Sequence, residues 1–249
     1  QSSNCLLREH VMQWYTSNVF YDTFLIVGFV YAALVLVSSF FGTAQYGGRF
    51  GGRGKGIKLG SKVGWIVMEF PGLLVFEPQV HGDSRGYFFE SYNEHTFKEQ
   101  GLEFRWVQDN QSSSGYGVIR GLHFQTPPNA QTKLIRVLRG SILDVVVDVR
   151  KGSPTYGQVL TIELSSENKK QLLVPRGFAH GFSVLSDQAE VLYKCDALYH
   201  KPSEQGILFA DPDLKIDWKI QAGKEIVSDK DQLLPFFRDF DSPFYFSEA

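Results

Sequence analysis

The chain has 249 residues, a formal net charge of -2 and 43% hydrophobic residues. These values allow one substantial hydrophobic core and exclude the strong positive charge that general nucleic-acid binding requires. With 21 Phe, 11 Tyr and 24 Gly against 2 Met, the composition favours short strands and turns over a helical bundle. Its cysteines, Cys5 and Cys195, lie far apart, so we expect no disulfide framework and a reducing compartment.

Residues 1–62 differ in composition from the rest, and we interpret them as an extension preceding a domain at 63–249. Within the extension, Phe24–Phe41 is an uncharged apolar run close to the ~20 residues that a helix needs to span a bilayer. The basic, Gly-rich stretch after it lacks the repeated RGG triplets of RNA-binding segments. Two interpretations stay open. The run is either a membrane anchor with the following domain in the cytoplasm, or an incidental extension.

After residue 63 the sequence alternates between short apolar runs and turn residues. This spacing, without helices of βαβ length, predicts an antiparallel sandwich or barrel. Asn93 is predicted to cap a short helix at Glu94–Gln100, Gln111–Gly117 to be a polar loop, and the chain after Tyr199 to form short helices or loops over the barrel. The predicted strands are Leu73–Phe76, Tyr87–Ser91, Phe104–Gln108, Val118–Phe124, Leu134–Leu138, Ile142–Val149, Gln158–Leu164, Gln171–Val174, His180–Leu185 and Glu190–Cys195.

The stretch Gly117–Lys133 carries Arg120, His123 and Lys133 and is the centre of the sequence. Strand alternation predicts that Arg120 and His123 point to opposite faces, and the turn at Pro127–Pro128 predicts a hairpin with the next strand. By itself, a histidine in a strand is more often a hydrogen-bonded core residue than a catalyst.

Cations and one tyrosine are further candidates. Arg85, Arg120 and Lys133 would attract an anion such as a diphosphate if they converged inside a barrel, and would otherwise be solvated side chains. Tyr193 lies in the apolar segment VLYKC, where a tyrosine usually packs in the core with its hydroxyl at a polar rim.

Several motifs occur in an order that resembles the dTDP-4-dehydrorhamnose 3,5-epimerase family, the nucleotide-sugar epimerases of deoxysugar biosynthesis. The resemblance runs from about Gly72 to Pro235. It implies an all-β antiparallel jelly-roll (cupin) barrel with short peripheral helices, which is typically a homodimer and uses no cofactor. The motifs are FEPQVHGDSRGYFFESYN, FRWVQDNQS, IRGLHFQ, NAQTKLIRVLRG, DVVVDVRKGSPTYGQ, LSSENKKQLLVPRGFAHGF, YKC followed by the turn at Ser203–Glu204, and SDKDQLLP.

The resemblance also implies roles for individual residues. His123 would be the general base, oriented by Asp231, and Tyr193 the proton donor on the opposite face of the sugar. Lys133 would lie against the C4 oxygen. The residues expected to bind the thymidine diphosphate and the sugar are Arg85, Glu90, Gln108, Asn110, Arg120, His180, Glu204 and Lys230.

We expect no metal ion. Cupin barrels that bind a metal usually carry two histidines one residue apart, but the position two after His123 is Gln125. His180 could add a second imidazole, and two histidines without a close third donor make a poor site.

The implied reaction is the epimerisation of dTDP-4-dehydro-6-deoxy-D-glucose at C3 and C5 to dTDP-4-dehydro-L-rhamnose. Three alternatives stay open. The first is an epimerase that inverts one of these carbons, a choice that the surroundings of Tyr199 would shape. The second is a non-catalytic cupin that binds a nucleotide sugar, which the presence of His123, Tyr193 and Asp231 disfavours. The third is a membrane-anchored scaffold that depends on residues 24–41.

Overall fold

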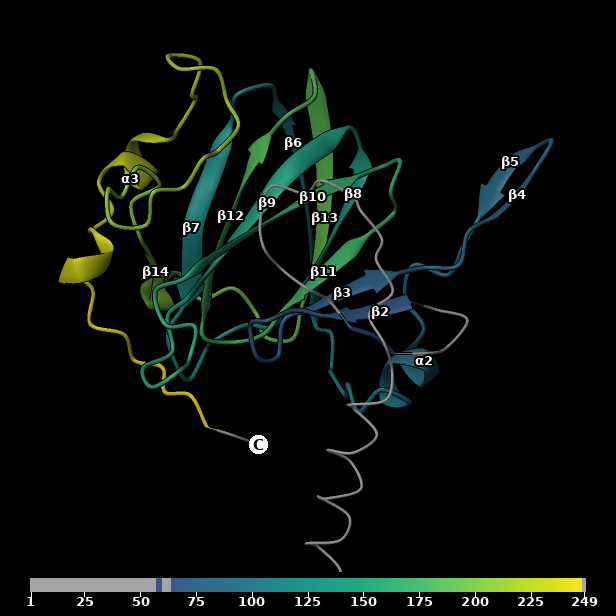
Figure 1. Cartoon of the computed structure of the whole chain (residues 1–249), viewed down its shortest axis with the longest axis horizontal. Coiled ribbons are helices and arrows are strands. Elements are labelled where there is room, and N and C mark those ends of the chain that lie inside the picture. The colour runs from purple at the N-terminus through teal and green to yellow at the C-terminus, as the bar shows by residue number, and fades with distance from the viewer. Residues whose placement is uncertain (1–56, 60–63, 248–249) are drawn as a thin grey trace, which may run out of the picture. The chain divides into compact units, whose positions relative to one another are not determined.

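The computed structural model describes residues 57–59 and 64–247 (Figure 1). These residues form two antiparallel β-sheets that face each other, with a separate two-stranded hairpin and short helices at the periphery. The predicted antiparallel sandwich or barrel is therefore confirmed. The predicted helix is also present as α2 (Glu94–Lys98), and the side chain of Asn93 caps it by accepting from the His95 N–H at 3.0 Å.

The larger sheet has seven strands and the smaller sheet has five. In spatial order, the larger sheet contains β1 (Ile57–Leu59), β2 (Gly64–Val67), β3 (Leu74–Glu77), β11 (Gln171–Val174), β8 (Lys133–Arg139), β13 (Gln188–Cys195) and β6 (Gln108–Gly115). The smaller sheet contains β10 (Val159–Ser165), β9 (Ser141–Asp148), β12 (Phe178–Val184), β7 (Ile119–Gln125) and β14 (Glu204–Gly206). The hairpin consists of β4 (His81–Asp83) and β5 (Gly86–Phe88), and the other helices of the described residues are α3 (Asp229–Gln232) and the 3-10 turns η1 (Lys201–Ser203) and η2 (Phe237–Asp239).

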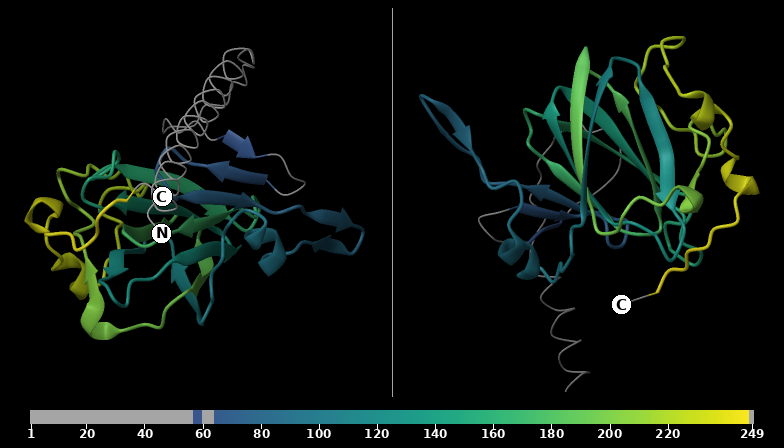
Figure 2. Two further views of the ribbon diagram at one scale, coloured as in Figure 1. Left: turned by 90° about the horizontal axis from the view of Figure 1, so that it is seen from below. Right: turned by 180° about the vertical axis from the view of Figure 1, so that it is seen from behind.

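The alternation of side chains along β9 explains how the smaller sheet is held on both faces. Ile142 and Val146 belong to the core between the two sheets, whereas Val145 and Val147 face the other way. Loops and turns that follow β14 cover this second face with Trp218 and other apolar side chains, and Figure 2 shows this C-terminal part along the outside of the smaller sheet. The prediction that the chain after Tyr199 lies over the barrel is confirmed.

Three local predictions were wrong. The predicted strand Phe104–Gln108 is not present, because β6 begins only at Gln108. β7 and β8 do not form a hairpin, because β7 pairs with β12 and β14 in one sheet while β8 pairs with β11 and β13 in the other. The segment between them crosses from sheet to sheet. The predicted polar loop Gln111–Gly117 lies mostly within β6, an edge strand that pairs along its whole length with β13. Its polar residues resemble a loop because an edge strand tolerates solvent on one side.

The predicted alternation along β7 was also wrong, with consequences for the site. His123 pairs with His180, but Arg120 pairs with Phe182, so one residue of β12 lies opposite two residues of β7. This is a β-bulge, and it puts Arg120 and His123 on the same side of the strand. Gly121 permits the bulge: its φ is +104°, and a Cβ there would lie 2.6 Å from the carbonyl oxygen of His180.

The apolar run at 24–41 and most of the predicted extension lie outside the described residues. Among the residues that the structure describes, no helix has the length and apolar character needed to cross a bilayer. One strand from the predicted extension, β1, pairs with β2 at the edge of the larger sheet. The boundary between residues 62 and 63 stays a prediction.

Candidate active site

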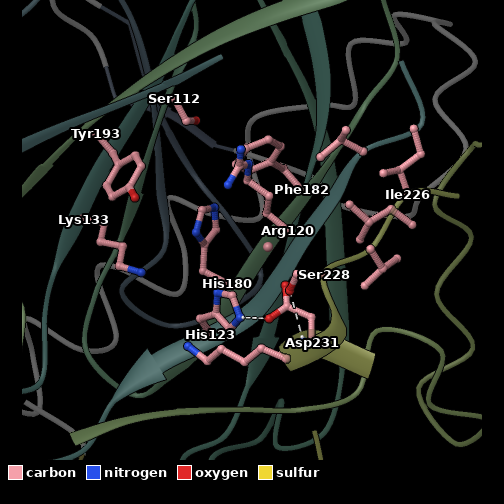
Figure 3. A pocket seen from close by; sticks show the side chains of 15 residues that line it. Ser112, Arg120, His123, Lys133, His180, Phe182, Tyr193, Ile226, Ser228 and Asp231 are labelled. Atoms are coloured by element: carbon pink, nitrogen blue, oxygen red, sulfur yellow. Dashed lines mark hydrogen bonds and ion pairs between the residues drawn. The ribbon is translucent and has the colours of Figure 1, made fainter. Parts of the chain in front are cut away.

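A pocket of about 470 Å³ opens between the two sheets (Figure 3). Its volume is in the range of small-molecule binding sites. Two strands of the smaller sheet supply Arg120, His123 and His180, and two strands of the larger sheet supply Lys133 and Tyr193. The short helix α3 and the residues before it close one wall. Side chains from both sheets therefore face a shared space.

His123 and Asp231 form a hydrogen-bonded pair in this pocket. The distance from His123 Nε2 to Asp231 Oδ1 is 2.7 Å, and the Asp231 side chain is only 6% exposed. Burial raises the pKa of Asp231, but the hydrogen bond and charge of His123 and the N–H of Gly121 outweigh it, so the pKa lies below its ordinary value. A carboxylate held in this way fixes the orientation and tautomer of an imidazole. His123 Nδ1 has no hydrogen-bond partner within the described part of the chain.

The position of Asp231 is set by its surroundings. The side chain of Ser228 caps α3 and accepts a hydrogen bond from the Asp231 N–H. The second carboxylate oxygen of Asp231 accepts from the N–H of Gly121 at 3.4 Å, within the bulge of β7. The bulge therefore both turns His123 toward the pocket and anchors its partner.

Lys133 and Tyr193 lie next to each other on the opposite wall. The Lys133 Nζ is 5.9 Å from the centre of the Tyr193 ring. Burial lowers the pKa of Lys133 and raises the pKa of Tyr193. Among the described residues, no hydrogen bond or ion pair holds the Lys133 amine, and Figure 3 shows it pointing into the pocket. The amine is therefore available to a ligand.

Two further site residues have partners of their own. His180 Nε2 lies 3.0 Å from both carboxylate oxygens of Asp144, and both side chains are buried. This pair is fixed in the wall of the smaller sheet. Arg120 donates from Nε to the Ser114 hydroxyl at 3.1 Å and otherwise extends over the pocket.

Glu204 and Lys230 form an ion pair beside the pocket, with 2.6 Å between the Lys230 Nζ and a Glu204 carboxylate oxygen. The Tyr199 hydroxyl donates to the same oxygen at 2.7 Å. Burial raises the pKa of Glu204, but these two hydrogen bonds and the Lys230 charge lower it overall. The ion pair joins α3 to β14.

Five of the predicted binding residues do not line the pocket, and Glu204, which lies beside it, is one of them. Gln108 and Asn110 share a face of β6 with Ser112, which does line it, and Gln108 accepts from the Tyr199 N–H at 2.8 Å. They continue the pocket wall toward Tyr199. Arg85 lies in the turn of the β4–β5 hairpin and pairs with Asp83, while Glu90 follows the hairpin and accepts from Asn93.

Comparison with known proteins identifies this arrangement. Residues 67–239 match the profile of the family described as dTDP-4-dehydrorhamnose 3,5-epimerase. The chain belongs to this family. A dTDP-4-dehydrorhamnose 3,5-epimerase of Shigella flexneri is 51% identical over 167 residues, which are 67% of this chain and 91% of that protein.

Solved structures of the epimerase family also superpose on the described fold. The enzyme of Elizabethkingia anophelis has a TM-score of 0.69 and 49% identity, covering 72% of this chain and 98% of that one. The enzyme of Legionella pneumophila, in complex with dTDP-4-keto-L-rhamnose, has a TM-score of 0.71 and 43% identity, covering 74% of this chain and all (100%) of that one. The predicted jelly-roll fold and the assignment as an isomerase of this epimerase family are confirmed.

The prediction from sequence missed several residues that line the pocket of this epimerase or support it. Ser112, Phe182 and Ile226 line the pocket, and the buried Ser112 hydroxyl has no partner among the described residues. Asp144 supports His180. An acidic residue inside the apolar run Ile142–Val149 was a visible signal for Asp144, whereas nothing in the sequence singled out Ser112.

No group of three or more His, Cys, Asp or Glu side chains in the described ranges has the arrangement of a metal site. His123 and His180 each bond to a carboxylate through Nε2. These imidazoles are thus organised for proton transfer and hydrogen bonding.

Proposed function

We propose that this chain epimerises dTDP-4-dehydro-6-deoxy-D-glucose at C3 and C5 to dTDP-4-dehydro-L-rhamnose, a step of dTDP-rhamnose biosynthesis. One observation carries the proposal. A histidine paired with a carboxylate and a tyrosine face the same pocket from opposite sheets, with a lysine beside them. Inversion of a carbon next to a ketone needs a base on one face, an acid on the other and a charge that stabilises the enolate.

His123 is the proposed base. Both C3 and C5 flank the C4 ketone, so a base that takes their protons leaves an enolate. The Asp231 carboxylate keeps the proton of the neutral imidazole on Nε2, and Nδ1 is then free to accept a proton from carbon. A positioned base of this kind contributes roughly 100- to 10,000-fold to the rate.

Lys133 is the proposed partner of the C4 oxygen. The negative charge of the enolate develops on that oxygen, and a cation in a water-poor pocket stabilises it best. Lys133 is half-buried, burial lowers the pKa of its amine, and the amine has no ion-pair partner among the described residues, so it offers its charge to a ligand. Removal of one such group typically reduces the rate about 100- to 1000-fold.

Tyr193 is the proposed acid. It lies on β13 of the larger sheet, whereas His123 lies on β7 of the smaller sheet. A sugar ring between the two sheets would therefore have the base on one face and the phenol on the other. The phenol is protonated at neutral pH, and burial raises its pKa further above the ordinary value of 10.0.

The proposed substrate-binding residues surround this centre. Arg120 and Lys230 reach the pocket with positive charges suited to a diphosphate, and His180 lines its wall. Gln108, Asn110 and Glu204 lie next to the wall near Tyr199. We assign these residues to the thymidine diphosphate and the sugar.

Arg85 and Glu90 support a homodimer. Arg85 lies in the turn of the β4–β5 hairpin and Glu90 lies just after it. This hairpin projects from the sandwich (Figure 1), and its Tyr87 and Phe88 are 61% and 68% exposed. Exposed aromatic side chains of this kind are typical of protein interfaces. We infer that each hairpin reaches the pocket of a second copy, where Arg85 and Glu90 complete the nucleotide site.

The dimer proposal has a direct test. Arg85→Ala and His123→Ala variants would each lose activity alone, the first through weaker substrate binding. When they are unfolded, mixed and refolded, a mixed dimer contains one pocket with both His123 and the second copy's Arg85. Activity that returns on mixing supports exchanged hairpins, whereas no recovery in a confirmed mixed dimer contradicts them.

The reaction itself is tested with the full chain, dTDP-4-keto-6-deoxy-D-glucose and D₂O, without added metal or nicotinamide. We expect proton NMR to show deuterium at C3 and C5 and inversion of both carbons. Deuterium at one carbon would indicate an epimerase of a single position. Bound dTDP without exchange at either carbon would indicate a nucleotide-sugar-binding protein.

A further inference from the structure

A second, much smaller cavity lies behind the pocket and shares part of its wall. Its volume is about 10 Å³, close to the minimum that a cavity needs to hold one water molecule. His123, Lys133 and His180 line both this rear cavity and the pocket. Gln125, Gln131 and Arg176 add polar groups to the lining of the rear cavity. A polar cavity of this size fits one hydrogen-bonded water molecule.

The proposed reaction, on which this inference rests, creates a need for such a site. Each inversion leaves one extra proton on His123 and removes one from Tyr193. A second inversion at the other carbon cannot begin until both residues have returned to their starting states. While the sugar lies in the pocket, it occupies the space between His123 and Tyr193. A route that bypasses the sugar is therefore required for two inversions in one binding event.

We propose that a water molecule in the rear cavity and the Lys133 amine return the proton from His123 to Tyr193. The Lys133 ammonium gives a proton to the Tyr193 phenolate, and the water gives a proton to the neutral amine. The N–H bond at His123 Nδ1 then breaks, and its proton goes to the water oxygen. The sum is a neutral imidazole, a phenol, an ammonium group and an unchanged water, without any oxidant or reductant.

The placement of Lys133 supports this route. Its amine lies 5.9 Å from the centre of the Tyr193 ring on one side, and the same residue lines the rear cavity with His123 on the other. Since no hydrogen bond or ion pair from the described residues fixes the amine, a rotation of its flexible stem can serve both neighbours. Burial also lowers the pKa of Lys133, which makes loss of its proton easier than for an exposed lysine.

His180 is less suited to the same task. Its Nε2 is bonded to both oxygens of the buried Asp144 carboxylate. That contact holds the ring in the wall of the smaller sheet and engages its Nε2, so His180 has less freedom to carry a proton than the Lys133 amine, which is unpaired among the described residues. Lys133 both lines the rear cavity and lies near the tyrosine ring.

The test fills the rear cavity without touching the pocket. Ala130 and Val174 line the rear cavity, are buried, and do not line the pocket. We expect Ala130→Val to reduce kcat about 10- to 100-fold at an unchanged KM, because a proton transfer has lost its carrier. Sugar inverted at one carbon should accumulate, since release then competes with the delayed second inversion. Val174→Ile, which adds one methyl group to the lining, should also reduce kcat and let singly inverted sugar accumulate.

Ala189→Val is the matched control. Ala189 is as buried as Ala130 but belongs to the core between the sheets and lines neither cavity. This variant should match Ala130→Val in thermal stability and keep the wild-type kcat and product pattern. Wild-type kcat without singly inverted sugar in a folded Ala130→Val and a folded Val174→Ile protein would overturn the proposal.

A measurement on the unaltered protein applies even if the variants do not fold. The dependence of kcat on the fraction of D₂O should curve, because several protons move in the reset. A straight line, which indicates one proton, would contradict the relay. If the wild-type chain inverted neither carbon, the proposed function itself would have failed. That result differs from a straight D₂O plot or from wild-type kcat in the cavity variants, each of which would contradict only the relay.

Discussion

His123 and Asp231 lie 108 positions apart in the chain, yet their side chains are joined by a hydrogen bond of 2.7 Å. One residue comes from β7, an inner strand of the smaller sheet, and the other from α3, a helix of a single turn. The bulge at Gly121 brings them together, because its N–H donates to Asp231 and its backbone turns His123 toward the pocket. The base and the residue that orients it are thus parts of one local structure.

We predict that Asp231→Asn reduces kcat about 100-fold or more, with a KM close to the wild-type value. The amide keeps the size of the side chain but no longer holds the imidazole in one tautomer or stabilises its cation. Asp229→Asn, which changes an exposed residue of the same helix, is the matched control and should be near wild type. Steady-state kinetics of the wild type and both variants would measure this. A kcat for Asp231→Asn equal to that of Asp229→Asn would contradict the assigned role of Asp231.

For Lys133→Gln we predict a fall of about 100- to 1000-fold in deuterium exchange at C3 and C5. The reason is the loss of the charge that stabilises the enolate. Lys194→Gln is the control, because Lys194 lies one strand away and pairs with Asp109 on the surface.

In the wild type, kcat should decline as pH rises through the pKa of Lys133. Since burial lowers that pKa, the decline should begin at a lower pH than an exposed lysine would give. A kcat that stays constant to strongly alkaline pH would argue against a catalytic ammonium.

Tyr193→Phe separates the two proton transfers. Removal of the proton by His123 precedes its return from the far side, so this variant should still exchange deuterium while inversion falls about 100-fold. Proton NMR in D₂O measures both quantities on one sample. Equal loss of exchange and inversion would indicate that Tyr193 acts only as part of the structure.

The strand β9 ends in a buried network that governs acid stability. The Asp148 carboxylate is fully buried and accepts hydrogen bonds from Arg150, Ser153 and Thr155. Burial raises the pKa of Asp148, but these bonds lower it overall, below the value of about 3.9 in an unfolded chain. Its contribution to stability is therefore complete above about pH 4 and is lost as pH falls through the folded pKa.

We predict that Asp148→Asn lowers the free energy of unfolding by about 3 kcal/mol at neutral pH, because Arg150 is left without its buried partner. The variant should also lose less stability than the wild type when the pH falls below about 4. Denaturant unfolding between pH 3 and 7 measures both effects. Asp241→Asn, which breaks an exposed ion pair with Lys151, should change little and serves as the control. Parallel curves for Asp148→Asn and the wild type would contradict the prediction.

The sequence was sufficient to predict the sandwich because its strands are marked by apolar runs and turns. It was not sufficient where strands depart from regular alternation. Arg120 and His123 were predicted on opposite faces, but the bulge at Gly121 puts both in the pocket. A bulge depends on how a strand is aligned with its partner strand. The alternation of residues within one strand does not reveal this alignment.

The sequence was also insufficient to place the residues of the site relative to one another. The resemblance carried by IRGLHFQ and SDKD implied that Asp231 orients His123, but no pattern in the sequence alone places these two residues side by side; the fold gives their contact of 2.7 Å. Arg85 was predicted to bind substrate, yet it lies on a projecting hairpin, and a single chain does not bring it to the pocket. Ser112 was missed because serines in a polar edge strand resemble those of a loop.

Solvent exchange in a His123→Ala variant tests the central claim most directly. The full chain and the variant would be incubated with dTDP-4-keto-6-deoxy-D-glucose in D₂O, and dTDP affinity would be measured for both by calorimetry. We predict deuterium at C3 and C5 for the wild type and none for the variant, with dTDP affinities that agree within about fourfold, or less than 1 kcal/mol. Near-normal exchange in the variant would contradict the assignment of His123 as the base.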